Sequence, residues 1–263
     1  MLLEIIIIVL RETLEASILI AVLLSVSKSQ GVSFAWVPVS LLAGIAGAAV
    51  YGSSLGVISE WFDYAGQEVV NAGLQFSVYL LVAALIPIQW RGVARSKRVL
   101  RNLMSVVVFV ALIREGAEIF IFYSGYLHKE DVLMKALTSG FVGVAVGLSV
   151  GAIVFYSLAM ANQSKVKLFH AGVLLLVAAG MVLQATQLLM QVDWLSSGEP
   201  LWDSSWFIAE ASVVGQMAYA IFGYEATPSL IELGAYSLSI IGIVFVAVFA
   251  NKFGKNQVII KSE

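Results

Sequence analysis

The sequence has 263 residues, of which 60% are hydrophobic and only 12% are charged. Soluble domains are about 45–50% apolar and about 25% charged, so this composition excludes a soluble globular protein and a disordered chain. The chain contains no cysteine, which excludes disulfides and thiolate metal sites, and its net charge of −2 gives no reason to expect a nucleic acid partner. A polytopic membrane protein remains, which we interpret as a single transmembrane domain over residues 1–263.

Several long apolar stretches follow one another along the chain. A membrane-spanning helix needs about 20 mostly apolar residues, because the hydrocarbon core is about 30 Å thick. Seven stretches meet this requirement, and they cover residues 2–26, 35–58, 69–90, 102–126, 137–160, 170–191 and 230–250. They are far longer than membrane β-strands, so the sequence predicts an all-α membrane protein with seven transmembrane helices.

Basic residues gather in alternate connections between these stretches. Eleven lie on one side: Lys28, Arg91, Arg95, Lys97, Arg98, Arg101, Lys165, Lys167, Lys252, Lys255 and Lys261. The opposite side has two, Lys129 and Lys135. Since cytoplasmic loops are rich in Lys and Arg, we predict an external N-terminus and a cytoplasmic C-terminus.

Acidic residues gather on the side predicted to be external. They are Glu60, Asp63, Glu68, Asp193, Glu199, Asp203, Glu210 and Glu225. Charged loops are ordinary in water, and that interpretation stays open. The alternative is an anionic vestibule that raises the local concentration of cations.

A short charged motif occurs twice, with an offset of 103 residues. Arg11, Glu12 and Glu15 form the first copy, and Arg114, Glu115 and Glu118 form the second. The two copies lie in the first and fourth predicted helices, which run in opposite directions. This predicts a 3+3 inverted repeat, with repeat 1 over about 1–101, repeat 2 over about 102–210 and a last helix over about 229–250.

Other residues support the repeat. Small residues recur at four-residue spacing in the second and fifth helices and predict close helix packing: Gly44, Ala48, Gly52 and Gly56, then Gly143, Gly147 and Gly151. Amide side chains recur in the third and sixth helices, including Asn71, Gln75, Gln184 and Gln187. We interpret the amides as interhelical hydrogen-bonding groups or, alternatively, as residues of a transport pathway.

The charged motifs restrict the chemistry. At 100° per residue, the three charged side chains of each motif lie within one arc of the helix. An ionised group at the bilayer centre costs at least about 2.5–3.5 kcal/mol, so these groups need partners. Arg11 and Arg114 can pair with Glu15 and Glu118, which would leave Glu12 and Glu115 without cationic partners.

The remaining charge of −2 can be neutralised in two ways. The first way is protonation of the carboxylates, because desolvation raises their pKa values. A bound cation is the other, and four carboxylates would form a hard-oxygen site that suits Fe³⁺ or a similar cation. A purely structural set of salt bridges also remains open.

These motifs resemble those of the oxidase-dependent iron permease family, found in fungal plasma membranes and in bacteria. The family's R-E-G-L-E is matched by Arg11, Glu12, Leu14 and Glu15, with Thr13 in place of glycine, and its R-E-G-x-E by Arg114 to Glu118. The family's F-G-Y-x-x-x-P-S corresponds to residues 222–229. Asn71 stands where many members have a glutamate.

The resemblance implies an iron transporter and not an enzyme. Iron, as Fe²⁺ or Fe³⁺, would be the substrate, and no cofactor would be bound permanently. Glu12, Glu15, Glu115 and Glu118 would handle the metal, and Arg11 and Arg114 would balance their charge. The protein would lie in the plasma membrane, the inner membrane of a bacterium. The resemblance also implies an extracytoplasmic oxidase, peroxidase or cupredoxin-like partner.

The segment before the last helix allows two interpretations. Ser229 and Glu232 fit a capping box that begins this helix. The capping box does not account for Tyr224 and Glu225, and an alternative role for these two residues is to line an external access route.

Other functions fit less well. Membrane di-iron and haem enzymes need several histidines within the helices, whereas the chain has only His128 and His170, both expected at the membrane interface. A retinal protein needs a lysine in the seventh helix, and residues 230–250 contain none. Transport of manganese, lead or calcium, or proton-coupled transport of another solute, stays open.

Overall fold

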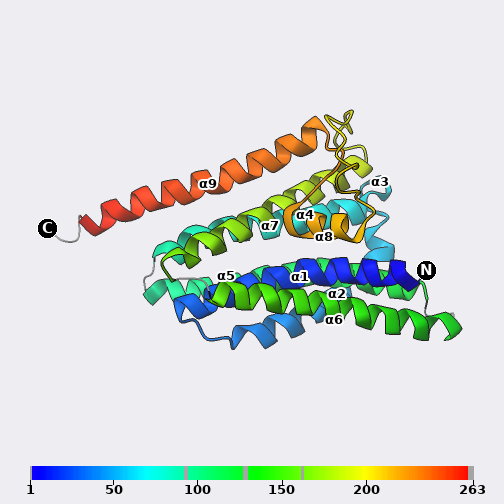
Figure 1. Ribbon diagram of the computed structural model, residues 1–263, viewed down its shortest axis with the longest axis horizontal. Helices are drawn as coiled ribbons and strands as arrows, with labels where there is room; N and C mark the ends of the chain where they lie inside the picture. The colour runs from blue at the N-terminus through cyan, green and yellow to red at the C-terminus, as the bar shows by residue number, and fades with distance from the viewer. Residues whose placement is uncertain (1, 92–93, 127–129, 161–162, 260–263) are drawn as a thin grey trace.

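The computed structural model describes residues 2–91, 94–126, 130–160 and 163–259, which form a helical bundle (Figure 1). No strand occurs in these residues. The helices are α1 (Leu2–Gln30), α2 (Trp36–Ile58), α3 (Trp61–Tyr64), α4 (Gly66–Arg91), α5 (Ala94–Ser124), α6 (Glu130–Met160), α7 (Gln163–Gln191), α8 (Val213–Phe222) and α9 (Leu230–Ile259).

Each predicted span coincides with a helix, but most helices extend beyond it. α5 begins at Ala94 and not near 102, α6 at Glu130 and not near 137, and α7 at Gln163 and not near 170. Hydropathy detects the part of a helix that suits hydrocarbon, whereas the backbone hydrogen bonds continue through the polar ends. The short helices α3 and α8 were not predicted.

Within the described residues, five helices are long and apolar enough to cross a membrane: Trp36–Ile58, Gly66–Gln89, Val132–Met160, Val166–Gln191 and Leu230–Ala250. α1 and α5 have comparable lengths but contain the charged motifs. Large apolar side chains cover the outer faces of α2, α6 and α9, including Val39, Leu42, Phe141, Leu148, Leu238 and Phe245. Such surfaces are unfavourable in water and fit contact with lipid.

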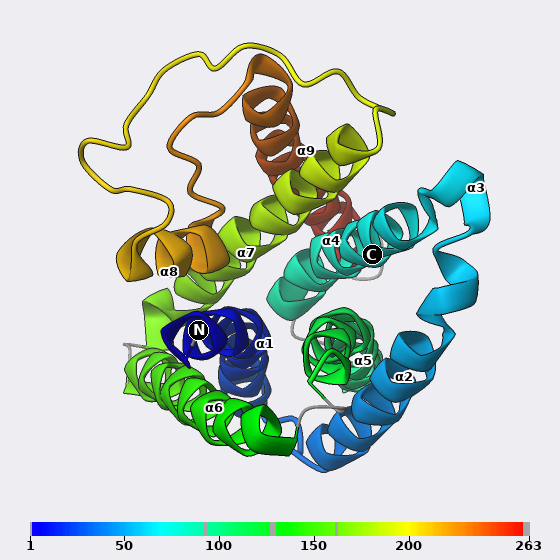
Figure 2. The ribbon, with the colours of Figure 1, turned by 90° about the vertical axis from the view of Figure 1, so that its right-hand side faces the viewer.

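The two motif helices lie in the interior of the bundle (Figure 2). α6 packs along α1, α2 packs along α5, and α4 packs along α7. α9 packs on α7 and α4, at the edge of the bundle. α1 and α5 are therefore held face to face by neighbours on both sides.

The small-residue stripes let these helices approach closely, as predicted. A methyl group on Gly44 would lie 2.7 Å from Leu112 Cβ, and one on Gly147 would lie 2.8 Å from Thr13 Cγ2. Gly56 is different, because a methyl group there would meet nothing within 4 Å. The α1–α6 and α2–α5 contacts are thus so close that larger side chains would not fit.

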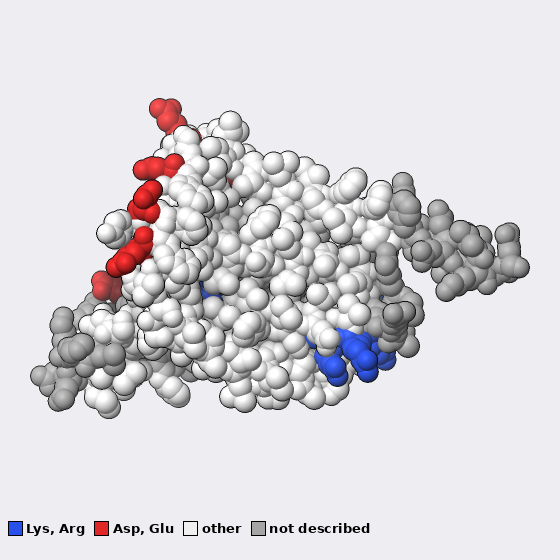
Figure 3. Space-filling view, turned by 180° about the vertical axis from the view of Figure 1, so that it is seen from behind, with Lys and Arg blue, Asp and Glu red and all other residues white. Residues whose placement is uncertain are grey.

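Charge separates the two ends of the bundle (Figure 3). One end, called here the acidic end, carries Glu60, Asp63, Asp193, Glu199, Asp203 and Glu210 in the connections around α3 and α8. The opposite, basic end carries Lys28, Lys97, Arg98 and Arg101. Lys129 and Lys261 lie outside the described residues, as do the side chains of Arg91, Arg95, Lys165, Lys252 and Lys255.

Candidate functional site

The two charged motifs meet at one buried place between α1 and α5. α1 supplies Arg11, Glu12 and Glu15, and α5 supplies Arg114, Glu115 and Glu118. Because the helices are antiparallel and each motif occupies one arc, the six side chains converge. We call the four glutamates the carboxylate cluster.

Arg114 contacts every member of the carboxylate cluster. Its Nη1 lies 2.6 Å from Glu115 Oε2, 3.2 Å from Glu15 Oε2 and 3.5 Å from Glu12 Oε2. Its Nη2 lies 2.8 Å from Glu118 Oε1. The side chain is only 5% exposed, so these contacts form in a low-dielectric interior where they are strong.

Arg11 holds a more peripheral position. Its Nε lies 3.5 Å from Glu15 Oε1 and 3.9 Å from Glu12 Oε1, and its side chain is 29% exposed. The predicted pairs Arg11–Glu15 and Arg114–Glu118 are therefore both present. Arg114 nevertheless neutralises far more of the cluster than Arg11 does.

The expectation that Glu12 and Glu115 lack cationic partners is wrong. Glu115 makes the shortest contact with Arg114, and Glu12 touches both arginines. Helix periodicity fixes where each Cα lies, but the long arginine side chain can reach an adjacent residue and the facing helix. Only the approach of α1 to α5 decides which carboxylates the guanidinium contacts.

The cluster is polar but is not arranged as a metal site. Among the described residues, no three His, Asp or Glu side chains form a group that could hold a metal ion. The guanidinium of Arg114 lies where the carboxylates converge. Arg114 Nε and Glu115 Oε1 are buried there without a hydrogen-bond partner in the described part of the chain.

The predicted amide residues extend the cluster towards α4 and α7. Gln184 Nε2 donates to Glu15 Oε2 at 3.1 Å, and the Gln75 amide donates to Gln184 Oε1. Asn71 accepts a hydrogen bond of 2.8 Å from the Tyr51 hydroxyl. Gln75, Gln184 and Asn71 are all buried, so the amides join helices by hydrogen bonds, as predicted.

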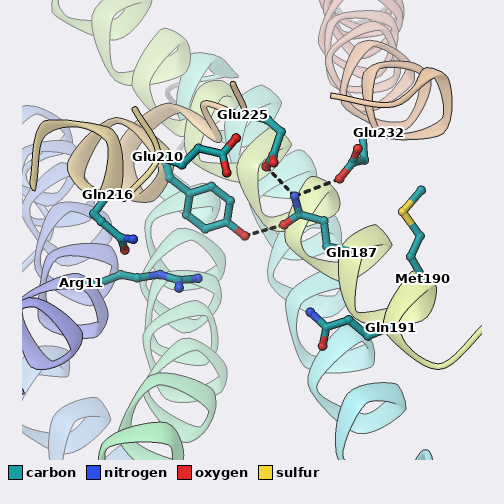
Figure 4. A pocket seen from close by; sticks show the side chains of 9 residues that line it. Arg11, Gln187, Met190, Gln191, Glu210, Gln216, Glu225 and Glu232 are labelled. Carbon is teal, nitrogen blue, oxygen red and sulfur yellow. Dashed lines mark hydrogen bonds between the residues drawn. The ribbon is translucent and has the colours of Figure 1, made fainter. Parts of the chain in front are cut away.

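A pocket of about 400 Å³ opens on the acidic-end side of the cluster (Figure 4). Its lining residues are Arg11, Gln187, Met190, Gln191, Glu210, Gln216, Tyr219, Glu225 and Glu232. We call it the acidic pocket. Since Arg11 lines the pocket and also contacts Glu15, the pocket reaches the edge of the carboxylate cluster.

Gln187 is the central hydrogen-bonding residue of the acidic pocket. Its Nε2 donates to Glu225 Oε2 at 2.6 Å and to Glu232 Oε1 at 3.0 Å (Figure 4). Its Oε1 accepts from the Tyr219 hydroxyl at 2.6 Å. The Arg11 guanidinium lies over the Tyr219 ring, with Arg11 Cζ 4.7 Å from the ring centroid. A continuous set of contacts therefore joins Glu225 to Arg11.

Tyr219 was missed from the sequence because α8 was missed. The signals for α8 were present: the Ser212 side chain caps its first turn by accepting from Gly215 N, and Gly223 ends it with a φ of 66°. Ser before a short apolar run and Gly after it are typical helix boundaries. The run is too short to span a membrane, and the search for membrane spans therefore passed over it.

The structure separates Tyr224 from Glu225. Glu225 lines the acidic pocket, whereas the Tyr224 hydroxyl donates to Ile208 O at 3.1 Å and lies 3.0 Å from Ser204 Oγ. Burial, and then the nearby carboxylate of Glu210, raise the pKa of Glu225 to about 7. Ser229 and Glu232 form the predicted capping box, with Ser229 N donating to Glu232 Oε2 at 2.7 Å.

His170 lies inside the protein, near the start of the apolar span Val166–Gln191. Its side chain is fully buried, and its Nε2 lies 2.8 Å from Ser25 Oγ. α7 begins at Gln163, so His170 is two turns inside the helix and faces α1. His128 lies outside the described residues.

Comparisons with known proteins find similarity over nearly the whole chain. The family model described as the iron permease FTR1 family matches residues 2–258. The chain is also 22% identical over 259 residues to the ferrous iron permease EfeU of Escherichia coli O6:H1 strain CFT073, covering 89% of this chain and 91% of that protein. No solved structure is significantly similar to the chain.

Proposed function

Because this chain belongs to the iron permease FTR1 family, an integral membrane transporter family and not a family of enzymes, we propose that it moves iron through the carboxylate cluster between α1 and α5. The observation that carries this proposal is the meeting of four glutamates and two arginines at one buried place. Two motifs that are far apart in sequence need not meet in a structure. Their convergence in two central helices is what a transport site requires.

The charge balance favours a cation as the substrate. Four ionised carboxylates and two arginines leave a charge of −2 in a low-dielectric interior, which is costly unless protons or a cation neutralise it. Iron bound to the carboxylates would supply this charge. Carboxylate oxygens are hard ligands, so both Fe³⁺ and Fe²⁺ remain candidate substrates.

Arg114 acts as the internal counter-ion of the empty cluster. Its guanidinium contacts Glu12, Glu15, Glu115 and Glu118, where an incoming cation would need the same oxygens. Iron binding therefore requires the guanidinium to withdraw, and iron release would let it return. Exchange of one positive charge for another keeps the cost of a buried, uncompensated carboxylate group low throughout transport.

The acidic pocket is the proposed access route. Its carboxylates attract cations, and its lining includes Arg11, which contacts the cluster. The acidic end would then be external and the basic end cytoplasmic, with the N-terminus outside and the C-terminus inside. An oxidase, peroxidase or cupredoxin-like partner would deliver iron at this external end.

Two further parts of the proposal concern architecture. With α1 and α5 added to the five apolar helices, the protein would cross the membrane seven times. The charged motifs explain why α1 and α5 are less apolar. The reciprocal packing of α1 on α6 and α5 on α2 supports a 3+3 inverted repeat followed by α9, within one permease domain.

Glutamate-to-glutamine variants test the function. Glu12→Gln, Glu15→Gln, Glu115→Gln and Glu118→Gln should each lose uptake of radiolabelled iron into proteoliposomes and lose iron-dependent thermal stabilisation. Glutamine keeps the shape of the side chain but removes the charge that balances iron. The exposed Glu60→Gln at the acidic end is the control and should transport normally.

Glu115→Gln should also be the least stable of these variants without iron. It removes the closest partner of the buried Arg114, and a hydrogen bond to a charged group contributes about 1.5–3 kcal/mol. Full uptake by any two of the four variants would contradict the cluster as the iron site. Uptake of Mn²⁺, Pb²⁺ or Ca²⁺ in place of iron would show that the protein transports another cation. Proton-driven uptake of a different solute would show that it is a proton-coupled transporter.

A further inference from the structure

Three side chains lie between the acidic pocket and the carboxylate cluster. They are Arg11 of α1, Gln187 of α7 and Tyr219 of α8, and all three line the pocket (Figure 4). None of the residues that line this pocket in the described part of the chain belongs to the cluster. Glu12 and Glu15 are only 3% and 2% exposed, so a cation in the pocket does not reach them directly. We call Arg11, Gln187 and Tyr219 the separating layer.

Two helices carry the separating layer and the cluster one turn apart. On α7, Gln187 lines the pocket, and Gln184, three residues earlier, donates to Glu15. On α1, Arg11 lines the pocket, and Glu15, four residues later, is buried. Three to four residues make one helical turn, which is about 5.4 Å long. A cation that moves from the pocket to the cluster therefore has to pass the side chains of Arg11 and Gln187.

Tyr219 joins the other two members of the separating layer. The Arg11 guanidinium lies over its ring, with Cζ 4.7 Å from the ring centroid. Its hydroxyl donates to Gln187 Oε1 at 2.6 Å. A cation–π contact and a hydrogen bond thus hold this tyrosine in place, and the guanidinium in turn lies 3.5 Å from Glu15 Oε1. Tyr219 therefore covers the arginine that covers the cluster.

The carboxylates of the pocket fix the orientation of Gln187. Its Nε2 donates to Glu225 Oε2 at 2.6 Å and to Glu232 Oε1 at 3.0 Å. An ionised carboxylate only accepts hydrogen bonds, so the amide nitrogen has to face the two glutamates. The amide oxygen is then turned towards the Tyr219 hydroxyl. Two residues outside the separating layer thus set up the hydrogen bond that holds Tyr219.

The helix that carries Tyr219 is short and has non-helical segments on both sides. α8 packs on α1 and α7, and residues 192–212 before it and 223–229 after it contain no helix. Its C-terminus is Gly223, with a φ of 66° that favours glycine. A shift of α8 would move Tyr219 away from Arg11 without unwinding any of the long helices.

We propose that Tyr219, carried by α8, is the outer gate of the transport pathway, and that the contacts with Arg11 and Gln187 hold it closed in this structure. Opening removes the ring from Arg11, and the guanidinium then no longer separates the pocket from Glu15. This inference rests on the proposed function and adds a gating step to it. Tyr219 acts through Arg11 and Gln187 and is therefore a positioning residue.

Access to the cluster tests the gate. Gln184 is 4% exposed and lies behind the separating layer, so Gln184→Cys is a suitable reporter in a chain without native cysteine. A positively charged, water-soluble thiol reagent should label this cysteine slowly in the purified protein. Tyr219→Phe loses the hydrogen bond to Gln187 and should speed labelling by about 2- to 12-fold. Tyr219→Ala also loses the contact with Arg11 and should speed it by more than about 12-fold.

Two controls separate a gate from general loosening. Tyr224→Phe removes a nearby hydroxyl that donates to Ile208 O, and it should leave the labelling of Gln184→Cys unchanged. Gln191 is exposed and lines the pocket, so Gln191→Cys should label at the same rate with and without Tyr219→Ala. Equal labelling of Gln184→Cys before and after Tyr219→Ala would overturn the gate, and so would an equal increase caused by Tyr224→Phe.

Gln187→Leu tests the hydrogen bond from its other end. It removes the acceptor of the Tyr219 hydroxyl and should speed labelling of Gln184→Cys about as much as Tyr219→Phe does. Because both changes remove the same bond, the combination of Gln187→Leu with Tyr219→Phe should add little to either one. Effects that multiply in the combined variant would contradict a gate held by this bond.

Iron affinity gives a second readout that needs no cysteine. A closed gate weakens the apparent affinity in proportion to the fraction of molecules that are open. Tyr219→Phe and Tyr219→Ala should therefore move the midpoint of Fe²⁺-dependent thermal stabilisation, measured without oxygen, to lower iron concentrations by the same factors as the labelling rates. Loss of a packing residue would lower the melting temperature without tightening iron binding. An unchanged or higher midpoint in Tyr219→Ala would overturn the gate.

The gate and the proposed function can fail separately. Loss of iron stabilisation in Glu12→Gln together with unchanged labelling in Tyr219→Ala would keep the cluster as the iron site and reject the gate. Normal uptake in the glutamate variants would instead reject the cluster as the iron site. The labelling rates of Gln184→Cys would still decide whether Tyr219 controls access to it.

Discussion

Arg114 is the residue that connects the whole carboxylate cluster, and Arg11 is its peripheral counterpart. Both Nη atoms of Arg114 are used, on carboxylates from two helices. A planar guanidinium can present several donors at once, whereas a lysine ammonium is a compact point charge. The two arginines should therefore differ in their sensitivity to replacement by lysine.

Arg114→Lys should insert into the membrane but unfold more easily and transport iron poorly. An ammonium cannot reach both Glu115 and Glu118, so buried carboxylate atoms lose partners, at a cost of about 1–3 kcal/mol. Arg11→Lys should cost less, because Arg11 is 29% exposed and its contacts are longer. Thermal unfolding in detergent measures both. An equal loss of stability would contradict the central position of Arg114.

Glu225 should make the stability of the acidic pocket depend on pH. Its pKa rises from the ordinary value of 4.5 to about 7, because of burial and the nearby Glu210. Between these values the folded protein holds a proton that the unfolded chain releases, so stability falls as pH rises. The other charged groups at the pocket are Arg11 and Glu232.

Comparison of wild type with Glu225→Gln isolates this effect. The melting temperature of wild type relative to the variant should fall from about pH 5 to about pH 7 and change little above that. Melting curves at several pH values measure the difference. A difference that does not vary with pH would show that Glu225 titrates normally.

At the scale of helices, close packing explains one departure from the family motif. Thr13 stands where the family's R-E-G-L-E has glycine, and it faces Gly147 of α6. In the other motif the glycine is kept as Gly116, and it faces Ala48 of α2. The α1–α6 and α2–α5 interfaces therefore each contain a glycine beside the charged motif. In the α1–α6 interface the partner helix α6 supplies it, whereas in the α2–α5 interface the motif helix α5 supplies it.

Gly147→Ala should destabilise the protein, and Thr13→Gly should reverse the effect. The new methyl group would lie 2.8 Å from Thr13 Cγ2 and 2.9 Å from Thr13 Cβ, and overpacking of this kind costs about 1–3 kcal/mol. The double variant removes the clash. Gly56→Ala is the control and should lose no stability, because nothing lies within 4 Å of the added methyl group. Thermal unfolding of the four proteins checks this, and failure of the double variant to recover would contradict it.

For the whole molecule, the separation of charge between the two ends predicts orientation. Lys97 is exposed at the basic end and Asp203 is exposed at the acidic end. Because the chain has no cysteine, single cysteines introduced at these positions can be labelled without background. An impermeant maleimide applied to intact cells should label Asp203→Cys and not Lys97→Cys. The reverse pattern would invert the proposed topology and make the acidic pocket cytoplasmic.

The sequence by itself determined the helical membrane architecture, the positions of the apolar spans, the charged motifs and the family. These features depend on local composition and on helical periodicity, which a single chain shows directly. It also predicted the close approach at Gly44 and Gly147 and the capping box of Ser229, because small-residue spacing and capping are local patterns.

Only the tertiary structure decided how the charged groups pair and what surrounds them. The contact of Arg114 with Glu115 and with both glutamates of α1 depends on the conformation of a long side chain and on how two helices meet. The placement of Tyr219 over Arg11 depends on α8, a helix too short to show as a membrane span. The burial of His170 depends on how α7 packs against α1, where Ser25 contacts the imidazole, and no local pattern contains this packing.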